Sequence, residues 1–235
     1  MVVKTLKEWF GENNMDISAE QLKMFNKYAL ILDNWNKIIN LTAIKDPREV
    51  AIRHFIDSVC LLKYENIDEG AKIIDVGTGA GFPGVPLKIM RPDIELTLLD
   101  SLNKRLIFLS DVLKNLELEA NLIHSRAEDK ARDTDYRDSY DVVVSRALAD
   151  LPSLCEYCLP YVKCGGYFYA LKGPYGDKEL AASENAIATL GAEFTDIISF
   201  SLPDESKRNI IKIKKVSPTP DAYPRNQKKI LRYPL

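Results

Sequence analysis

A glycine-rich turn directly after a short apolar run constrains this chain more than any other feature. The run 72–76 is rich in β-branched residues, carries Asp75 near its end, and passes into a loop with glycine at positions 77, 79, 81 and 84. Such a run is typical of a buried strand. The glycines permit positive φ and let backbone N–H groups approach a ligand closely, and Pro83 suits a first helical turn. The segment therefore predicts a strand–loop–helix junction that holds a nucleotide-like ligand.

Two other kinds of glycine loop can be compared with this spacing. A phosphate-binding P-loop needs Lys after its last glycine, but Val85 follows Gly84, which excludes it. The dinucleotide fingerprint G-x-G-x-x-G fits from Gly79 but not from Gly77. Asp75 favours a different ligand, because a carboxylate repels a pyrophosphate and attracts a cation. S-adenosylmethionine carries such cationic groups, while a nicotinamide cofactor remains the alternative.

Strand and helix patterns alternate after residue 72, which predicts an α/β fold with a doubly wound, mostly parallel sheet. The expected strands cover 72–76, 95–100, 120–124, 140–145, 167–171, 194–202 and 209–216. The main expected helices between them cover 103–118, 151–162 and 178–190. No helix separates the last two strands, so we expect an antiparallel edge strand. Four prolines after residue 216 predict an irregular tail.

Two amphipathic helices are expected before the sheet. The segment 18–21 has the form of a capping box, and apolar residues follow at three- and four-residue steps through position 39. Asp46 as N-cap and Pro47 in the first turn start the second helix, which we expect to end near Leu62.

Arg53, His54 and Asp57 would be neighbours on this second helix because they are three and four residues apart. A salt-bridged helix surface is the simplest interpretation of such a group.

Charge is distributed unevenly along the 235 residues. The segment 207–235 holds nine basic residues and one acid, a charge of +8, so the remainder carries −10 within the net −2. A basic end on an acidic body suggests a polyanionic partner such as RNA, although lysines that protect a strand edge would give the same pattern. The chain has neither an apolar run of membrane-spanning length nor a signal peptide, so we expect a cytoplasmic protein without a membrane partner.

The cysteines do not predict a metal site. Cys155 and Cys158 have the spacing of a zinc knuckle, but no second pair of cysteines or histidines completes it. We expect these thiols to pack in the core and the protein to hold no metal.

In a doubly wound sheet the ligand lies beyond the carboxyl ends of the strands. Asp100 ends the second expected strand and could accept both hydroxyls of a cofactor ribose. Glu128 after the third strand could meet an adenine amino group, unless 128–130 is simply an exposed loop. Arg146 after the fourth strand could hold a carboxylate or a phosphate, with a purely structural arginine as the alternative.

Six separated blocks resemble a known family, namely 40–44, 53–58, 75–84, 100–105, 126–128 and 145–147. They look like the bacterial ribosomal RNA small subunit methyltransferase G family, also called glucose-inhibited division protein B. The resemblance implies a class I methyltransferase (Rossmann-like) fold with a seven-stranded sheet and an N-terminal helical cap. It also implies methyl transfer from S-adenosylmethionine to guanine N7 in 16S ribosomal RNA of the small ribosomal subunit, giving 7-methylguanosine.

The residues and the resemblance together give one candidate site. The expected cofactor-binding residues are Asp75, Gly77, Gly79, Gly81, Phe82, Asp100, Ser101, Leu102, Ala127, Glu128 and Arg146. The catalytic residue is unassigned, with Arg146 and Lys172 as candidates. Guanine N7 carries a free lone pair, so its methylation needs no strong general base. The sequence accordingly shows no Ser/His/Asp or Cys/His set, no Pro-Cys pair and no Asn-Pro-Pro loop.

We therefore predict a monomeric S-adenosylmethionine-dependent ribosomal RNA methyltransferase of three segments. An N-terminal helical cap covers 1–63, the cofactor-binding methyltransferase domain covers 64–216, and a basic tail covers 217–235. A nicotinamide-dependent oxidoreductase and a non-catalytic RNA-binding module are the alternatives.

Overall fold

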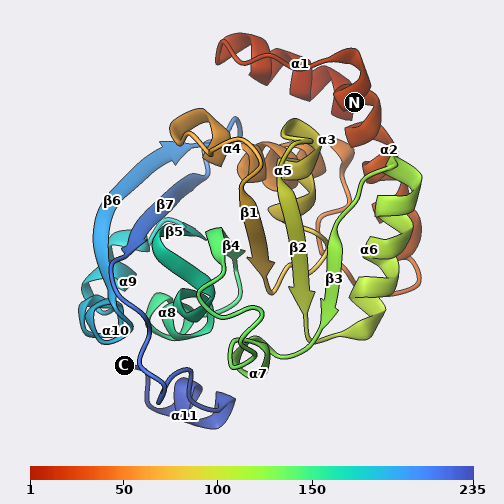
Figure 1. Cartoon of the computed structure of the whole chain (residues 1–235). Coiled ribbons are helices and arrows are strands. Elements are labelled where there is room, and N and C mark those ends of the chain that lie inside the picture. Colours follow the sequence, from red (N-terminus) through yellow and green to blue (C-terminus); the bar gives the residue numbers. More distant parts are fainter.

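The computed structural model describes residues 1–235, and a seven-stranded sheet of order β3-β2-β1-β4-β5-β7-β6 forms its centre (Figure 1). The strands are β1 (Lys72–Val76), β2 (Glu95–Asp100), β3 (Asn121–His124), β4 (Tyr140–Arg146), β5 (Val162–Lys172), β6 (Ala192–Ser201) and β7 (Lys207–Lys215). The α-helices are α1 (Val2–Glu12), α2 (Ala19–Asn36), α3 (Pro47–Val50), α4 (Asp57–Tyr64), α5 (Gly84–Met90), α6 (Asn103–Leu116), α7 (Ala127–Lys130), α8 (Leu151–Cys158), α9 (Gly176–Ala181), α10 (Glu184–Thr189) and α11 (Gln227–Arg232). A π-helical segment η1 (Ala51–Ile56) joins α3 to α4, and a 3-10 turn η2 (Leu159–Tyr161) follows α8.

The predicted fold class is confirmed, with one difference in the position of the antiparallel strand. Strands β1 to β5 pair in parallel, whereas β7 is antiparallel to both β5 and β6. We expected the antiparallel strand at the edge, but β7 lies one place inside it. The chain after β6 turns back into the space between β5 and β6, where β7 finds backbone partners on both sides. The edge strand at this end of the sheet is therefore β6, and most of its residues are exposed or half-buried.

The N-terminal helices begin where the sequence predicts. Ser18 and Gln21 form the predicted capping box, and Asp46 accepts hydrogen bonds from the backbone of the first turn of α3. Helices α2, α4, α5 and α6 lie on one face of the sheet and α1 packs against α2 and η1, and all of them share one core with the sheet, which includes Phe25, Phe55, Val85 and Leu98. The helical cap thus covers a face of the sheet, and the boundary at residues 63 and 64 stays a prediction.

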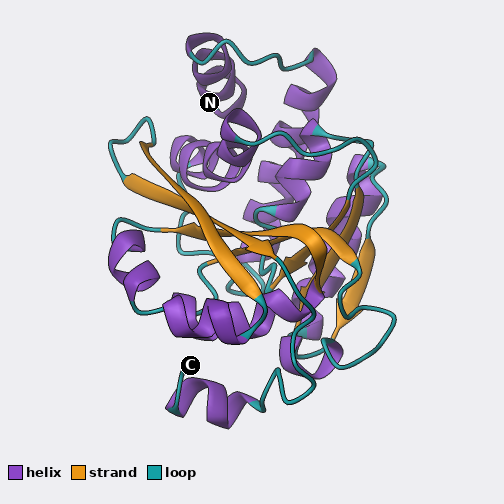
Figure 2. Cartoon of the chain, turned by 60° about the vertical axis from the view of Figure 1, so that its left-hand side comes forward, coloured by secondary structure: helices purple, strands orange, loops and turns teal.

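A second core fills the opposite face of the sheet. It joins inward-facing residues of β4, β5 and β7 to helices α8, α10 and α11. Figure 2 shows strands between helices on both sides, with the two chain ends on opposite sides of the sheet. Among all these helices, none combines the length and the hydropathy that a membrane span requires.

The prediction of an irregular tail is wrong for its last part. Helix α11 begins after Asn226, whose side chain accepts a hydrogen bond from Lys229 N. Ile230 is fully buried in the second core. No proline lies between Pro224 and Pro234, and six of the residues in that interval form this short helix.

Candidate functional site

Asp75 lies behind the glycine loop and ties it together. Its Oδ2 accepts hydrogen bonds from Thr78 Oγ1 at 2.7 Å and from Gly84 N at 2.8 Å. Burial raises the pKa of this carboxyl to about 6, against the opposing effect of the two hydrogen bonds. Oδ1 is buried and has no hydrogen-bond partner. Buried acceptors of this kind are rare, and a cationic ligand group would satisfy this one, which fits S-adenosylmethionine.

Asp100 joins the loop after β1 to the loop after β2. Its Oδ2 accepts from Gly79 N and its Oδ1 from Leu102 N, both at 2.9 Å. Arg105 Nη1 lies 3.1 Å from Oδ2 and 3.4 Å from Oδ1. A carboxylate has about four acceptor positions, and these contacts occupy them, so ribose hydroxyls would take the positions that Arg105 fills. Asp100 thus lies at the strand end where a ribose is expected.

A cleft of about 190 Å³ opens beside these loops. Five of the predicted cofactor residues line it, namely Gly77, Asp100, Ser101, Ala127 and Glu128. The cleft is smaller than the roughly 300–1,000 Å³ of many ligand pockets. Leu148 contributes to this, because its side chain lies directly over Gly77, where an added Cβ would stand 2.8 Å from Leu148 Cδ1.

The other predicted cofactor residues do not line this cleft. Gly79 and Gly81 hold the turn at φ values of +61° and +90°, and Leu102 is exposed beside Asp100. Phe82 is buried and stacks between Tyr28 and His54, with ring centroids 5.5 Å and 4.5 Å away. Arg146, with its guanidinium 5.1 Å from the Phe82 ring centre, belongs to a second hollow.

This second hollow has a volume of about 490 Å³ and contains Arg146 at its wall. Arg146 Nη1 donates to Asp57 Oδ2 at 3.0 Å and to the Arg53 carbonyl at 3.1 Å. Its Nη2 lies 3.3 Å from His54 Nδ1. The expected salt-bridged surface of the second helix is therefore wrong for His54 and Asp57, which are only 8% and 5% exposed. The π-helical segment just before α4 carries His54, and such segments often occur at functional sites.

His54 is neutral in this environment. Burial, together with the charge of Arg146, lowers its pKa to about 3. Because Arg146 donates toward Nδ1, the ring proton resides on Nε2, which lies 2.9 Å from Thr42 Oγ1. The ring therefore serves as an acceptor for Arg146 and as a stacking partner for Phe82.

Two further cations complete the hollow. Lys172 Nζ lies 2.6 Å from Glu179 Oε2 and donates to the Ala149 carbonyl at 2.8 Å. Arg208 Nε donates to Asp57 Oδ1 at 3.1 Å. With Arg53 and Arg146, the lining holds four cations against the carboxylates of Asp57 and Glu179. Arg53 is already paired outside the lining, with Asp204 Oδ2 at 2.7 Å. The three other cations exceed the two lining carboxylates by one charge, which suits a phosphate-bearing ligand.

The sequence analysis did not assign His54, Asp57 or Arg208 to the site. The rule that ligands lie beyond the carboxyl ends of parallel strands does not point to Arg208. Strand β7 is antiparallel, so its amino end, which carries Arg208, lies beside the carboxyl end of β5. Asn209, the neighbour of Arg208, pairs with Lys172 at the end of β5. The spacing of Arg53, His54 and Asp57 predicts only a salt-bridged helix surface, because their burial depends on distant segments.

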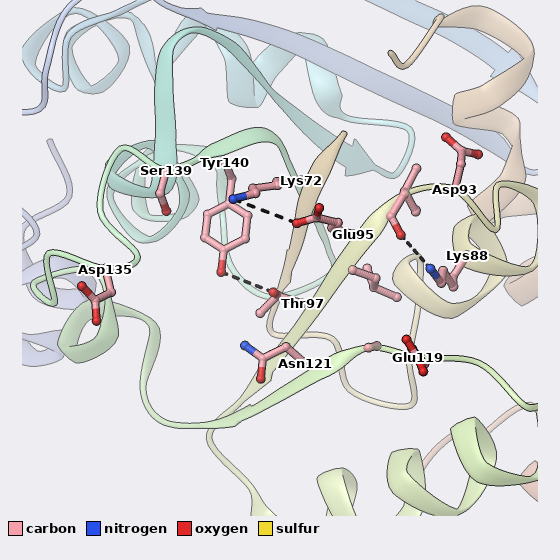
Figure 3. Close-up of a pocket in the computed structure, with 13 residues that line it drawn as sticks. Lys72, Lys88, Asp93, Glu95, Thr97, Glu119, Asn121, Asp135, Ser139 and Tyr140 are labelled. Atoms are coloured by element: carbon pink, nitrogen blue, oxygen red, sulfur yellow. Dashed lines mark hydrogen bonds and ion pairs between the residues drawn. The ribbon is translucent and has the colours of Figure 1, made fainter. Parts of the chain in front are cut away.

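A third hollow, of about 520 Å³, lies at the opposite edge of the sheet (Figure 3). It is formed by the amino ends of β1 to β4, and none of the predicted site residues lines it. Within its lining, Lys72 faces Glu95 at 4.0 Å and Lys88 donates to the Ile94 carbonyl at 2.7 Å. This pocket is therefore separate from the candidate site.

The structure shows no cluster of the side chains that most often bind metals. No three His, Cys, Asp or Glu residues come together in a way that would hold a metal ion. Cys155 and Cys158 pack in the second core, where burial raises the pKa of both thiols.

Comparison with known proteins separates likeness of fold from likeness of sequence. Solved structures with this fold include Thermus thermophilus TrmN, with a TM-score of 0.53 and 14% identity over 68% of this chain and 48% of that one. Another is M. jannaschii TYW2 in complex with AdoMet, with a TM-score of 0.51 and 12% identity over 63% of this chain and 71% of that one. At such identities these structures show the fold alone.

Sequence relatives are much closer. Proteins named ribosomal RNA small subunit methyltransferase G from Clostridium kluyveri and Desulforamulus reducens are 47% and 49% identical, each over 94% of this chain and 93% of their own length. The family model described as rRNA small subunit methyltransferase G (GidB) matches residues 21–211. The chain therefore belongs to the rRNA small subunit methyltransferase G family.

Proposed function

We propose that this chain transfers a methyl group from S-adenosylmethionine to N7 of a guanine in 16S ribosomal RNA of the small ribosomal subunit. Family membership makes it a ribosomal RNA methyltransferase. The observation that carries the cofactor is the buried Asp75 carboxylate behind the glycine loop, whose Oδ1 has no hydrogen-bond partner and whose charge would attract a cationic ligand held by the loop. The nucleobase atom and the ribosomal subunit follow from the family resemblance.

The cofactor proposal assigns parts of the ligand to the cleft and its surroundings. The turn through Gly77, Gly79 and Gly81 would approach the ligand with its backbone, and Asp100 would accept the ribose hydroxyls. Ser101, Leu102, Ala127 and Glu128 would surround the adenine, with Phe82 and Arg146 toward the substrate. When bound, S-adenosylmethionine supplies a methyl group on a cationic sulfur.

The substrate proposal rests on the second hollow. Its cations come from separate elements, with Arg53 from η1, Arg146 from β4, Lys172 from β5 and Arg208 from β7. Their excess charge supports binding of RNA phosphates beside the target guanine. N7 has no proton to lose, so the neutral His54 is not required as a base. Positioning of the base against the methyl group would then account for most of the rate.

Arg146 is the stronger of the two catalytic candidates. It contacts Phe82 on the cofactor side and Asp57 on the substrate side, whereas Lys172 is already paired with Glu179. We assign Arg146 to orienting the reactants and Lys172 to the phosphate-binding wall.

The proposal extends to location and assembly. A ribosomal RNA target supports a cytoplasmic location. We further propose that the chain is a monomer. Light scattering on the purified protein tests the assembly state.

Methylation with labelled cofactor tests the function. The purified chain is incubated with methyl-labelled S-adenosylmethionine and either deproteinised 16S ribosomal RNA or small subunits, and nuclease fragments are analysed by mass spectrometry. We expect one 7-methylguanosine. No label despite RNA binding would favour the non-catalytic RNA-binding module, and tight NADH binding without S-adenosylmethionine binding would favour the oxidoreductase.

A further inference from the structure

The C-terminal helix α11 closes one side of the cofactor cleft. Gln227 and Leu231, one helical turn apart, line the cleft together with Glu128 and Tyr157. Gln227 Oε1 accepts a hydrogen bond of 2.7 Å from Arg126 Nη1. Arg126 immediately precedes Ala127 and Glu128, so this bond connects the tail to the loop proposed to surround the adenine.

A buried ion pair holds the start of this helix in place. Arg225 Nε donates to Glu156 Oε1 at 2.9 Å and its Nη2 to Oε2 at 2.7 Å, while Arg225 N also donates to Oε1 at 2.6 Å. Glu156, on α8, has no exposed surface. A carboxylate buried to this degree needs its donors, so the pairing fixes the tail against the body of the protein.

The preceding stretch of the tail is fixed by a second arginine. Arg137 Nη2 donates to the Thr219 carbonyl at 2.7 Å, and its Nη1 to the Tyr223 carbonyl at 3.0 Å. Ile230 anchors α11 itself in the second core. The tail is therefore bound along its length and is part of the site, not a free basic arm.

The two side chains that α11 presents to the cleft are complementary to a purine. Leu231 is 58% exposed and offers an apolar surface beside the cleft. Gln227 Nε2 makes no hydrogen bond within the chain and is available to a ring nitrogen. Glu128, across the cleft, offers acceptors for an exocyclic amino group.

We propose that α11 forms a wall of the cofactor site, with Leu231 and Gln227 contacting the nucleobase of S-adenosylmethionine and the Glu156–Arg225 pair acting as the positioning pair. The inference rests on the proposed function. It gives the tail a role in cofactor affinity that is separate from any contact with RNA.

Calorimetric titration of the full chain with S-adenosylhomocysteine tests this wall. Leu231→Ala and Gln227→Ala should each weaken binding about tenfold, and the volume-conserving Leu231→Met should restore it. Lys229→Ala is the matched control, because Lys229 lies roughly 200° around the same helix from both residues. It should leave the dissociation constant unchanged.

The positioning pair is tested through steady-state kinetics. Arg225→Lys keeps the charge but loses the two-pronged contact, so the KM for S-adenosylmethionine should rise several-fold while the KM for ribosomal RNA stays constant. A merely structural role would lower the amount of folded, active protein and leave both KM values unchanged. That result, or wild-type affinity in both cleft variants, would overturn the inference. If the wild-type chain itself bound no S-adenosylhomocysteine, the proposed function would fail instead.

Discussion

Arg146 and Asp57 form an ion pair of 3.0 Å although 89 positions separate them in the chain. The other oxygen of Asp57 accepts a hydrogen bond from Arg208 at 3.1 Å. One carboxylate at the start of α4 thus holds guanidinium groups from β4 and β7. Because the two cations share one acid, removing Arg146 and removing Asp57 should have different consequences.

Arg146→Ala should impair catalysis much more than stability. Asp57 keeps Arg208 as a partner, so the free energy of unfolding should fall by only about 1 kcal/mol. Methyl transfer should fall roughly 100-fold, because the reactants lose a group that orients them. Urea denaturation and single-turnover methylation measure the two effects, and proportionate losses in both would contradict the assigned role.

Asp57→Ala should mainly destabilise the fold. It leaves two largely buried cations without their shared carboxylate, which should lower the free energy of unfolding by about 3 kcal/mol. Glu49→Ala is a suitable control, because Glu49 is exposed and lies 3.9 Å from the half-exposed Arg53. Its cost should stay below about 1 kcal/mol. Similar midpoints of urea denaturation for the two variants would argue against the bridging role of Asp57.

Gly81→Ala should be more damaging than Gly79→Ala. Both glycines have left-handed backbones, which alone should cost an alanine about 1–2 kcal/mol. At Gly81 the added Cβ would also stand 2.5 Å from Tyr28 Oη and 2.8 Å from Leu109 Cδ2, whereas at Gly79 the nearest atom is 3.9 Å away. This crowding should add about 1–3 kcal/mol. Equal thermal stability of the two variants would show that the loop relieves the contact with Tyr28.

Asp75 should make stability depend on pH below neutrality. Its pKa is about 6 in the folded chain and 3.8 in its ordinary state. Between about pH 4 and 6 the folded chain retains a proton that the unfolded chain has lost, so this group's contribution to the free energy of unfolding falls as the pH rises and is constant above that range. In Asp75→Asn this part of the pH dependence should vanish from urea denaturation curves.

Titration of Asp75 should change the affinity for the cofactor in the opposite direction, so that affinity rises as the pH rises. Above pH 6 the Asp75 carboxylate is charged and attracts a cationic ligand. The affinity for S-adenosylmethionine should therefore increase from pH 5 to pH 7.5 in the wild type and change less in Asp75→Asn. Calorimetry at these two pH values measures the difference, and parallel curves would mean that the free oxygen of Asp75 does not face the ligand's charge.

The sheet was predictable because its strands are short apolar runs bounded by glycine, aspartate or proline. Asp75, Asp100 and Arg146 could be placed at one edge from these runs alone, since parallel strands end together. The position of β7 was not predictable in the same way. Hairpin pairing requires antiparallel neighbours but does not determine which side of β6 the returning strand takes.

The site residues that the sequence did not predict are positioned by contacts between distant segments. Asp57 and His54 appear on a helix with ordinary amphipathic spacing, and only their burial against Arg146 distinguishes them from a surface group. Helix α11 was missed for a related reason. Its six residues are too short to form a helix alone, and it depends on Ile230 and on the ion pair of Arg225 with α8.

Because β7 and α11 come last in the chain, a truncating mutation near the end of the gene would remove both. A nonsense mutation after the codon for Ser206 would leave the sequence of the glycine loop and of β1 to β6 intact, yet it would remove Arg208 from one hollow, the α11 wall from the cleft, and β7, which is the pairing partner of β6 in the sheet. Truncated products would therefore retain every recognisable sequence block of the family while lacking part of each pocket. Loss-of-function alleles in the final 30 codons should accordingly be as severe as those in the glycine loop.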